Sequence, residues 1–108
     1  MYQRSLELLD LVDAIVEAMP RGRGHLKLQL DRAATSIVLN IAEGAGEFSA
    51  DEKRRFYRMA RRSATEAAAI LHVIARRGHA PEAQTASARE LLARIVAMLV
   101  RMTSDPAR

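Results

Sequence analysis

The stretch Gln29-Leu-Asp-Arg-Ala-Ala-Thr-Ser-Ile-Val-Leu-Asn-Ile-Ala-Glu-Gly44 decides the fold of this chain. An α-helix turns about 100° per residue, so side chains spaced three and four apart lie on one face. Apolar residues at this spacing predict a core-facing helix over residues 26–45. Gly44 and Gly46 fit its end, where a left-handed residue is usually needed. Its inner face is expected to consist of Leu30, Ala34, Ile37, Ile41 and Ala45.

A line of polar residues follows the same spacing on the other side of this helix. It consists of Gln29, Arg32, Ser36, Asn40 and Glu43. One interpretation is that the line simply faces water. However, Leu28 and Leu39 flank it, and Ser and Asn are poor choices for an exposed helix interior. The other interpretation is that the line is buried and hydrogen-bonded to a neighbouring helix or an adjacent subunit.

The rest of the chain predicts three further helices. The first spans residues 4–19 and carries, opposite its apolar face, the acidic line Glu7, Asp10, Asp13 and Glu17. Ser49 and Glu52 form a capping box that opens a long helix, which Gly78 ends. A fourth helix is expected over residues 82–102, followed by a frayed tail over residues 104–108. Because the connections are short, the predicted fold class is all-α, an antiparallel up-down four-helix bundle, with residues 1–108 as a single domain.

Composition narrows the function classes. The chain has no cysteine, so neither a disulfide framework nor thiolate chemistry is available. No signal-peptide pattern and no apolar run long enough for a membrane span occur, so we expect a cytoplasmic protein with no membrane partner. The net charge is +4, and all the basic side chains except Lys27 and Lys53 are arginines, which suit phosphates and interface ion pairs.

No catalytic constellation is found. The histidines His25, His72 and His79 form neither a His-x-x-x-His nor a Glu-x-x-His pattern, so a dinuclear metal site is not expected. Ser36 and Ser63 lie within predicted helices, and no histidine is spaced to activate them. The sequence therefore predicts a protein that is not an enzyme and that holds no metal or cofactor.

The most concentrated charge lies on the third predicted helix. Arg54, Arg55, Arg58, Arg61 and Arg62 occupy about a third of its circumference, with Lys53 beside them. Two interpretations stay open. In the first, the cluster has no binding role: it faces solvent, or its charge is matched by the acidic line of the same or another subunit. In the second, it is a phosphate-binding surface. Tyr57 is the only aromatic residue near the cluster, so contacts to the phosphate backbone are favoured over base stacking. The inward face of this helix is expected to be Phe56, Met59, Ala60, Ser63, Ala67, Ile70, Leu71 and Ile74.

The pattern Gln29-Leu-x-Arg32-Ala-Ala-x-Ser36-Ile-x-x-Asn40-Ile-Ala-Glu43-Gly44, continued by Phe56-Tyr57-x-x-Ala60-x-x-Ser63-x-x-Glu66, resembles a family signature. It is similar to that of the four-helix bundle proteins related to the 23S rRNA intervening-sequence protein and, more distantly, to accessory proteins of diversity-generating retroelements. The resemblance implies a homo-oligomer, with a homopentamer favoured, and leaves the molecular function unassigned. Val38 and Ala68 depart from the pattern, where many members have Pro and a second Glu. The resemblance also marks a polar network of Gln29, Arg32, Ser36, Asn40, Glu43, Ser63 and Glu66.

Two functional hypotheses follow. The leading one is a non-enzymatic oligomeric scaffold that associates with RNA, or with an RNA–protein complex, through Lys53, Arg54, Arg55, Arg58, Arg61 and Arg62. The alternative is a protein-interaction adaptor whose basic face binds an acidic protein partner and no nucleic acid.

Overall fold

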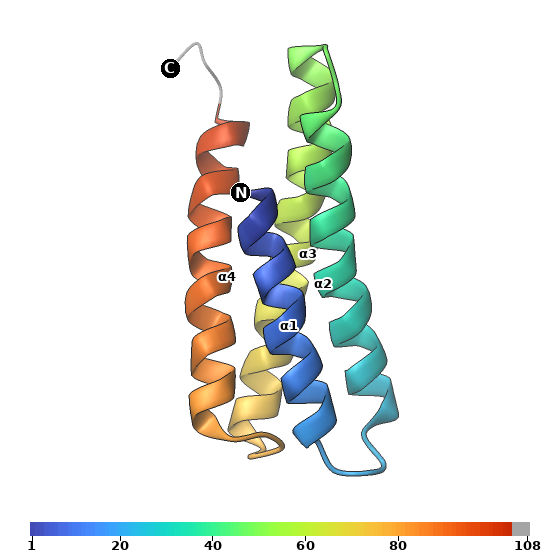
Figure 1. Cartoon of the computed structure of the whole chain (residues 1–108), viewed down its shortest axis with the longest axis vertical. Coiled ribbons are helices and arrows are strands. Elements are labelled where there is room, and N and C mark those ends of the chain that lie inside the picture. The colour runs from blue at the N-terminus through green and yellow to red at the C-terminus, as the bar shows by residue number, and fades with distance from the viewer. Residues whose placement is uncertain (105–108) are drawn as a thin grey trace.

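The computed structural model describes residues 1–104, which form four helices in sequence (Figure 1). They are α1 (Tyr2–Ala18), α2 (Gly24–Ala45), α3 (Ala50–Arg76) and α4 (Glu82–Thr103). No strand occurs in this part of the chain. The predicted bounds of α2, α3 and α4 hold to within two residues, and α1 begins two residues earlier than expected. The expected fraying of the C-terminal tail concerns residues 105–108, which lie outside the described residues.

The helices run alternately up and down and pack side by side (Figure 1). Each helix contacts the next one along the chain, and α4 returns to contact α1, whereas the diagonal pairs α1–α3 and α2–α4 do not touch within residues 1–104. The predicted antiparallel up-down four-helix bundle is therefore confirmed. The bundle measures 46 × 22 × 20 Å. As a result, the acidic line of α1 and the arginines of α3 lie on opposite corners.

The core consists of one apolar stripe from each helix. Alanines fill much of the contact between α2 and α3, and these small side chains allow the two backbones to approach closely. No helix among the described residues is both long and apolar enough to cross a membrane. The largest fully buried aliphatic side chains are Leu8, Ile15, Leu30, Ile37, Ile41, Leu71, Ile74, Leu92, Ile95 and Leu99.

The helix ends follow the sequence signals in two places and differ in one. The Ser49 side chain accepts a hydrogen bond from the Glu52 backbone N–H at 3.3 Å, which caps α3, and Gly78 ends it with φ +66°. The left-handed exit expected at Gly44 and Gly46 is wrong: Gly46 has φ −85° and Gly44 lies inside α2. Gly44 is needed for another reason, because a Cβ there would lie 2.5 Å from Cε1 of Tyr57.

Candidate functional site

The polar line on α2 divides between solvent and the helix interface. Gln29, Arg32 and Glu43 are exposed, whereas Ser36 and Asn40 are half-buried against α3. This difference arises because α2 is covered on only one flank by α3, and Ser36 and Asn40 lie on that flank. Gln29, Arg32 and Glu43 are therefore not buried within one chain, and their burial against an adjacent subunit stays a prediction.

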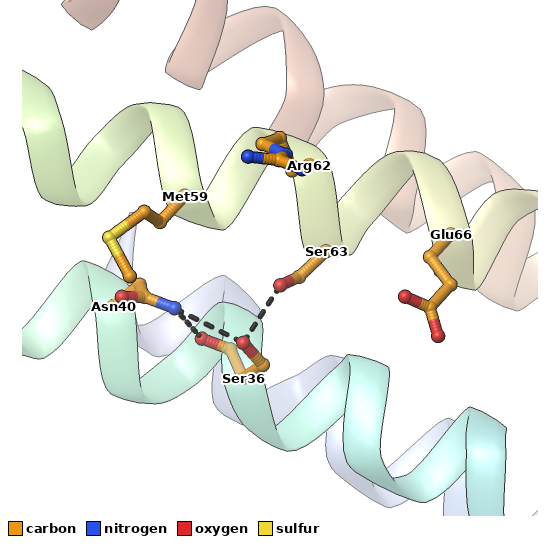
Figure 2. Close-up of a pocket in the computed structure, with 6 residues that line it drawn as sticks. All are labelled: Ser36, Asn40, Met59, Arg62, Ser63 and Glu66. Carbon is orange, nitrogen blue, oxygen red and sulfur yellow. Dashed lines mark hydrogen bonds between the residues drawn. The ribbon is translucent and has the colours of Figure 1, made fainter.

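Ser36 joins α2 to α3 through a hydrogen bond, and Asn40 supports Ser36 from within α2 (Figure 2). The hydroxyls of Ser36 and Ser63 lie 2.7 Å apart across the two helices. The Asn40 amide nitrogen donates to the Ser36 carbonyl oxygen at 2.9 Å and to its hydroxyl at 3.1 Å. Each such bond contributes about 0.5–1.5 kcal/mol to stability. The three side chains therefore act first as a structural link between the two helices.

An open hollow of about 380 Å³ lies above this link. Met59, Arg62 and Glu66 of α3 form its rim, with Ser36, Asn40 and Ser63 below (Figure 2). Glu66, which the family resemblance includes in the polar network, is exposed and makes no hydrogen bond to α2 among the described residues. A second hollow of about 420 Å³ shares Ser36 and Asn40 and extends over the outer side of α2. This region can receive a polar group, but it holds no acid–base pair in hydrogen-bond contact.

The arginine cluster of α3 contains both compensated and uncompensated charges. Arg54 forms an ion pair with Asp51, and Arg55 forms one with Glu52, each at 2.9 Å. The hydrogen bonds that Arg55 donates to the Glu52 carboxylate raise the pKa of Arg55 above its ordinary value. Arg55 also stacks on Phe56, with 4.7 Å from its guanidinium carbon to the ring centroid. Lys53 lies 3.5 Å from the Ala45 carbonyl oxygen at the end of α2.

The other three arginines of the cluster have no carboxylate partner within residues 1–104. Arg61 donates to the hydroxyl of Thr103 on α4 at 2.8 Å, which holds its guanidinium at the α3–α4 edge. Arg58 and Arg62 are exposed. Together with Thr65, these three arginines line a hollow of about 300 Å³. We call Arg58, Arg61 and Arg62 the α3 patch. Pairing with the acidic line of α1 in the same chain is ruled out, because α1 and α3 are diagonal.

Two side chains of α3 lie differently from the sequence prediction. Tyr57 was placed beside the arginine cluster, yet it is buried, with 4% of its surface exposed. Burial also raises the pKa of its phenol. Met59 was expected inside but is 41% exposed. The ring of Tyr57 fits into the space left by Gly44, whereas Met59 lies at the rim of the open hollow. Tyr57 is consequently unavailable for stacking on a base.

The side chains that could bind a metal ion do not gather in one place among the described residues. Within the described residues, no group of three His, Cys, Asp or Glu side chains converges in a way that could hold a metal ion. His72 is exposed on α3, away from Ser36 and Ser63. What the arrangement offers is three guanidiniums on one helix face beside a polar hollow.

Comparison with known proteins agrees with the observed fold. The family model described as 23S rRNA-intervening sequence protein matches residues 1–101. A crystal structure of a protein of unknown function from the S23 ribosomal protein family of Bacteroides thetaiotaomicron is similar, with a TM-score of 0.86. The two sequences are 20% identical, and the match covers 96% of this chain and 98% of that chain, so the likeness shows the fold alone. Among curated proteins, none matches. None of these matches supports the more distant resemblance to retroelement accessory proteins.

Proposed function

The chain belongs to the 23S rRNA-intervening sequence protein family, and we propose that it is a non-enzymatic oligomeric scaffold that binds RNA, alone or within an RNA–protein complex. The observation that carries the proposal is the α3 patch: three guanidiniums on neighbouring turns of one helix, with no carboxylate partner among the described residues. Arginine binds phosphate through two parallel N–H donors. Since the proposed partner is RNA, we also propose a cytoplasmic location.

The patch suits phosphate contacts better than base recognition. The cluster has no exposed tyrosine or tryptophan, because Tyr57 is buried, and Phe56 is covered by the Arg55 guanidinium. Stacking of single-stranded bases needs open aromatic rings. Binding would therefore follow charge and backbone shape, with little dependence on base sequence.

Assembly of several copies would strengthen a patch of this size. Three phosphate contacts in one chain give a weak site, and joining copies raises the effective concentration of the remaining patches once one is bound. Two leucines on the outer side of α2, Leu28 and Leu39, are 51% and 59% exposed and offer apolar area for contacts between copies. A pentamer is the state favoured by the family resemblance.

The test compares two double variants with the same change in net charge. Arg58→Gln/Arg62→Gln removes two exposed members of the α3 patch. Arg4→Gln/Arg94→Gln removes two exposed arginines away from α3. Arg4 is ion-paired with Glu7 within α1, and Arg94 with Glu90 within α4. Binding of a structured RNA is measured by fluorescence anisotropy across a salt series. Each lost phosphate contact should reduce the slope of log affinity against log salt by about 0.7–0.9.

The expected result is a loss of about 1.4–1.8 in slope for the α3 variant and little change for the control. Helicity and assembly, checked by circular dichroism and mass photometry, should match the unsubstituted chain, because Arg58 and Arg62 are exposed. Equal affinities for the two variants would contradict the proposal.

A second candidate function is an adaptor that binds an acidic protein and no nucleic acid. It is favoured by Met59, 41% exposed beside Arg62 at the rim of the first hollow, and by Leu39, 59% exposed at the second hollow over α2. Apolar side chains, methionine and arginine are common in the centres of protein interfaces. A complex that persists after nuclease treatment, and that Leu39→Ser disrupts, would favour this function over RNA binding.

A further inference from the structure

A second group of basic residues gathers at the end of the bundle that holds the α1–α2 and α3–α4 connections (Figure 1). The first connection carries Arg23, and α3 ends at Arg76 followed by Arg77. Arg76, Arg77 and His72 line an open hollow of about 400 Å³. We call Arg23, Arg76, Arg77 and His72 the loop-end site. It combines side chains that are more than 50 residues apart in the sequence.

The two connections lie close enough to share an electrostatic environment. His79, in the α3–α4 connection, has a lowered pKa, firstly because of burial and then because of the charges of Arg23 and Arg77. The His79 imidazole is therefore affected by one positive charge from each connection. Protonating His79 would add a further positive charge to the same end of the bundle.

Little negative charge compensates this end within residues 1–104. None of Arg23, Arg76 and Arg77 forms an ion pair there, and α2 begins without an acidic residue in its first turn. Two carboxylates lie at this end. Glu82 forms an ion pair with Arg89 at 3.2 Å, and Glu17 is exposed on the last turn of α1. The guanidiniums of the loop-end site are thus available to an external anion.

The α3 patch and two members of the loop-end site, His72 and Arg76, lie along one side of α3. Arg58 and Arg76 are 18 residues apart, which is five full turns, so they point in the same direction about 27 Å from each other. Between Arg62 and Arg76 this side carries no carboxylate except Glu66, which lies at the rim of the hollow toward α2. A ligand that engages both sites must be long, regular and negatively charged on its surface.

We propose that the loop-end site is a second phosphate-binding site and that, together with the α3 patch, it holds a double-stranded RNA segment lying along α3. This inference rests on the proposed function and names its substrate class. A duplex presents its phosphates outward at regular spacing and is stiff over this distance. Residues 58–77 include no Phe, Tyr or Trp on which unpaired bases could stack, which disfavours a single strand.

The experiment uses three labelled RNAs in low and moderate salt. One is a hairpin of about five base pairs, too short to span both sites; one is a duplex of about 16 base pairs, the span typical of modules that read duplex shape; and one is a single strand of the same length. The proteins are the unsubstituted chain, Arg76→Gln/Arg77→Gln, Arg58→Gln/Arg62→Gln and the Arg4→Gln/Arg94→Gln control.

The long duplex should bind the unsubstituted chain at least about tenfold more tightly than the short hairpin or the single strand. Arg76→Gln/Arg77→Gln should remove this advantage and lower the salt slope for the long duplex by about 1.4–1.8, with little effect on the hairpin. Thermal unfolding of each variant checks that the exposed substitutions leave the fold intact.

Other outcomes overturn the inference in distinguishable ways. If the Arg58 variant loses affinity and the Arg76 variant does not, the loop-end site is not a phosphate site, and the proposed function stands. Equal binding of the single strand and the duplex overturns the assignment to duplex RNA. If the unsubstituted chain binds none of the three RNAs at low salt, both the inference and the proposed function fail.

Discussion

Replacing Gly44 by alanine tests how α2 and α3 are locked together. Gly44 is buried within α2, where a change from glycine to alanine normally stabilises a helix by about 1 kcal/mol. Here the new Cβ would lie 2.5 Å from Cε1, 2.8 Å from Cδ1 and 3.1 Å from Cζ of Tyr57. Ordinary contacts begin near 3.4 Å, so the ring or the helix must move by roughly 1 Å.

The clash should outweigh the gain in helix propensity. The Tyr57 ring is only 4% exposed and has no open space to move into, so the cost should lie at the upper end of the range for overpacking, about 3 kcal/mol. Subtracting the gain of about 1 kcal/mol in helix propensity leaves a net loss of about 2 kcal/mol in the free energy of unfolding. Urea unfolding followed by circular dichroism, at fixed protein concentration, measures it.

Two further variants decide whether the ring is responsible. Gly46→Ala is the matched control, because its Cβ would meet only the Ala42 and Glu43 carbonyl oxygens at 3.7 Å, and it should change stability by less than about 0.5 kcal/mol. In a Tyr57→Leu background, Gly44→Ala should cost at least about 1 kcal/mol less than in the unsubstituted chain. If Gly44→Ala is as stable as the unsubstituted chain, the close approach of Tyr57 to Gly44 does not hold, and this account of the motif is wrong.

Three other predictions follow from the hydrogen bonds and the shifted pKa values. Asn40→Ala removes two hydrogen bonds to Ser36 and should lower the free energy of unfolding by about 1 kcal/mol in urea, whereas Gln29→Ala, at an exposed position, should change it by less than about 0.5 kcal/mol. The pKa of Tyr57 is raised by burial, so the unfolded chain loses this proton first. The contribution of Tyr57 to stability should be constant below pH about 10, and stability should fall above it, less so in Tyr57→Phe, as followed by unfolding at several pH values. The pKa of His79 is lowered in the folded chain, so its contribution to the free energy of unfolding is present above pH about 6.5. That contribution is lost as the pH falls through the pKa that His79 has in the folded chain. The acid-induced loss of stability should therefore be smaller in His79→Asn.

The regular parts of the fold could be predicted because they depend on local signals. The spacing of Leu30, Ile37 and Ile41 fixes the inner face of α2, and all three are at most 1% exposed. The Ser49 cap and the left-handed Gly78 mark both ends of α3. Each of these signals lies within one or two helical turns of the structure that it specifies, so no tertiary information is needed.

The features that were missed depend on contacts between distant segments. The burial of Tyr57 depends on the absence of a side chain at Gly44 on the neighbouring helix, and the periodicity within α3 does not contain this information. The loop-end site needs Arg23 and Arg77 at the same end of the bundle, where the charges of both act on His79, and only the antiparallel topology brings their two connections to one end. The division of the polar line on α2 depends likewise on which flank α3 covers.

The family motif is explained by packing between α2 and α3 more than by binding chemistry. Ser36, Asn40 and Gly44 are spaced four apart on α2 and face Ser63 and Tyr57 on α3. Sliding α2 by four residues, about 6 Å, would place Asn40 where Gly44 receives the ring and would break the link between the serines. The motif therefore selects one register of the two helices.

This role of the motif separates what specifies the fold from what gives the function. The motif positions that select the register of α2 and α3 are half-buried or buried, whereas Arg58, Arg62, Arg76 and Arg77 are exposed and lie outside the motif. Two chains could thus share the motif and the bundle and still differ in what they bind, because the exposed side of α3 can change without affecting the register. Functional tests on this chain should consequently substitute the exposed arginines, and substitutions within the motif should be interpreted as tests of stability.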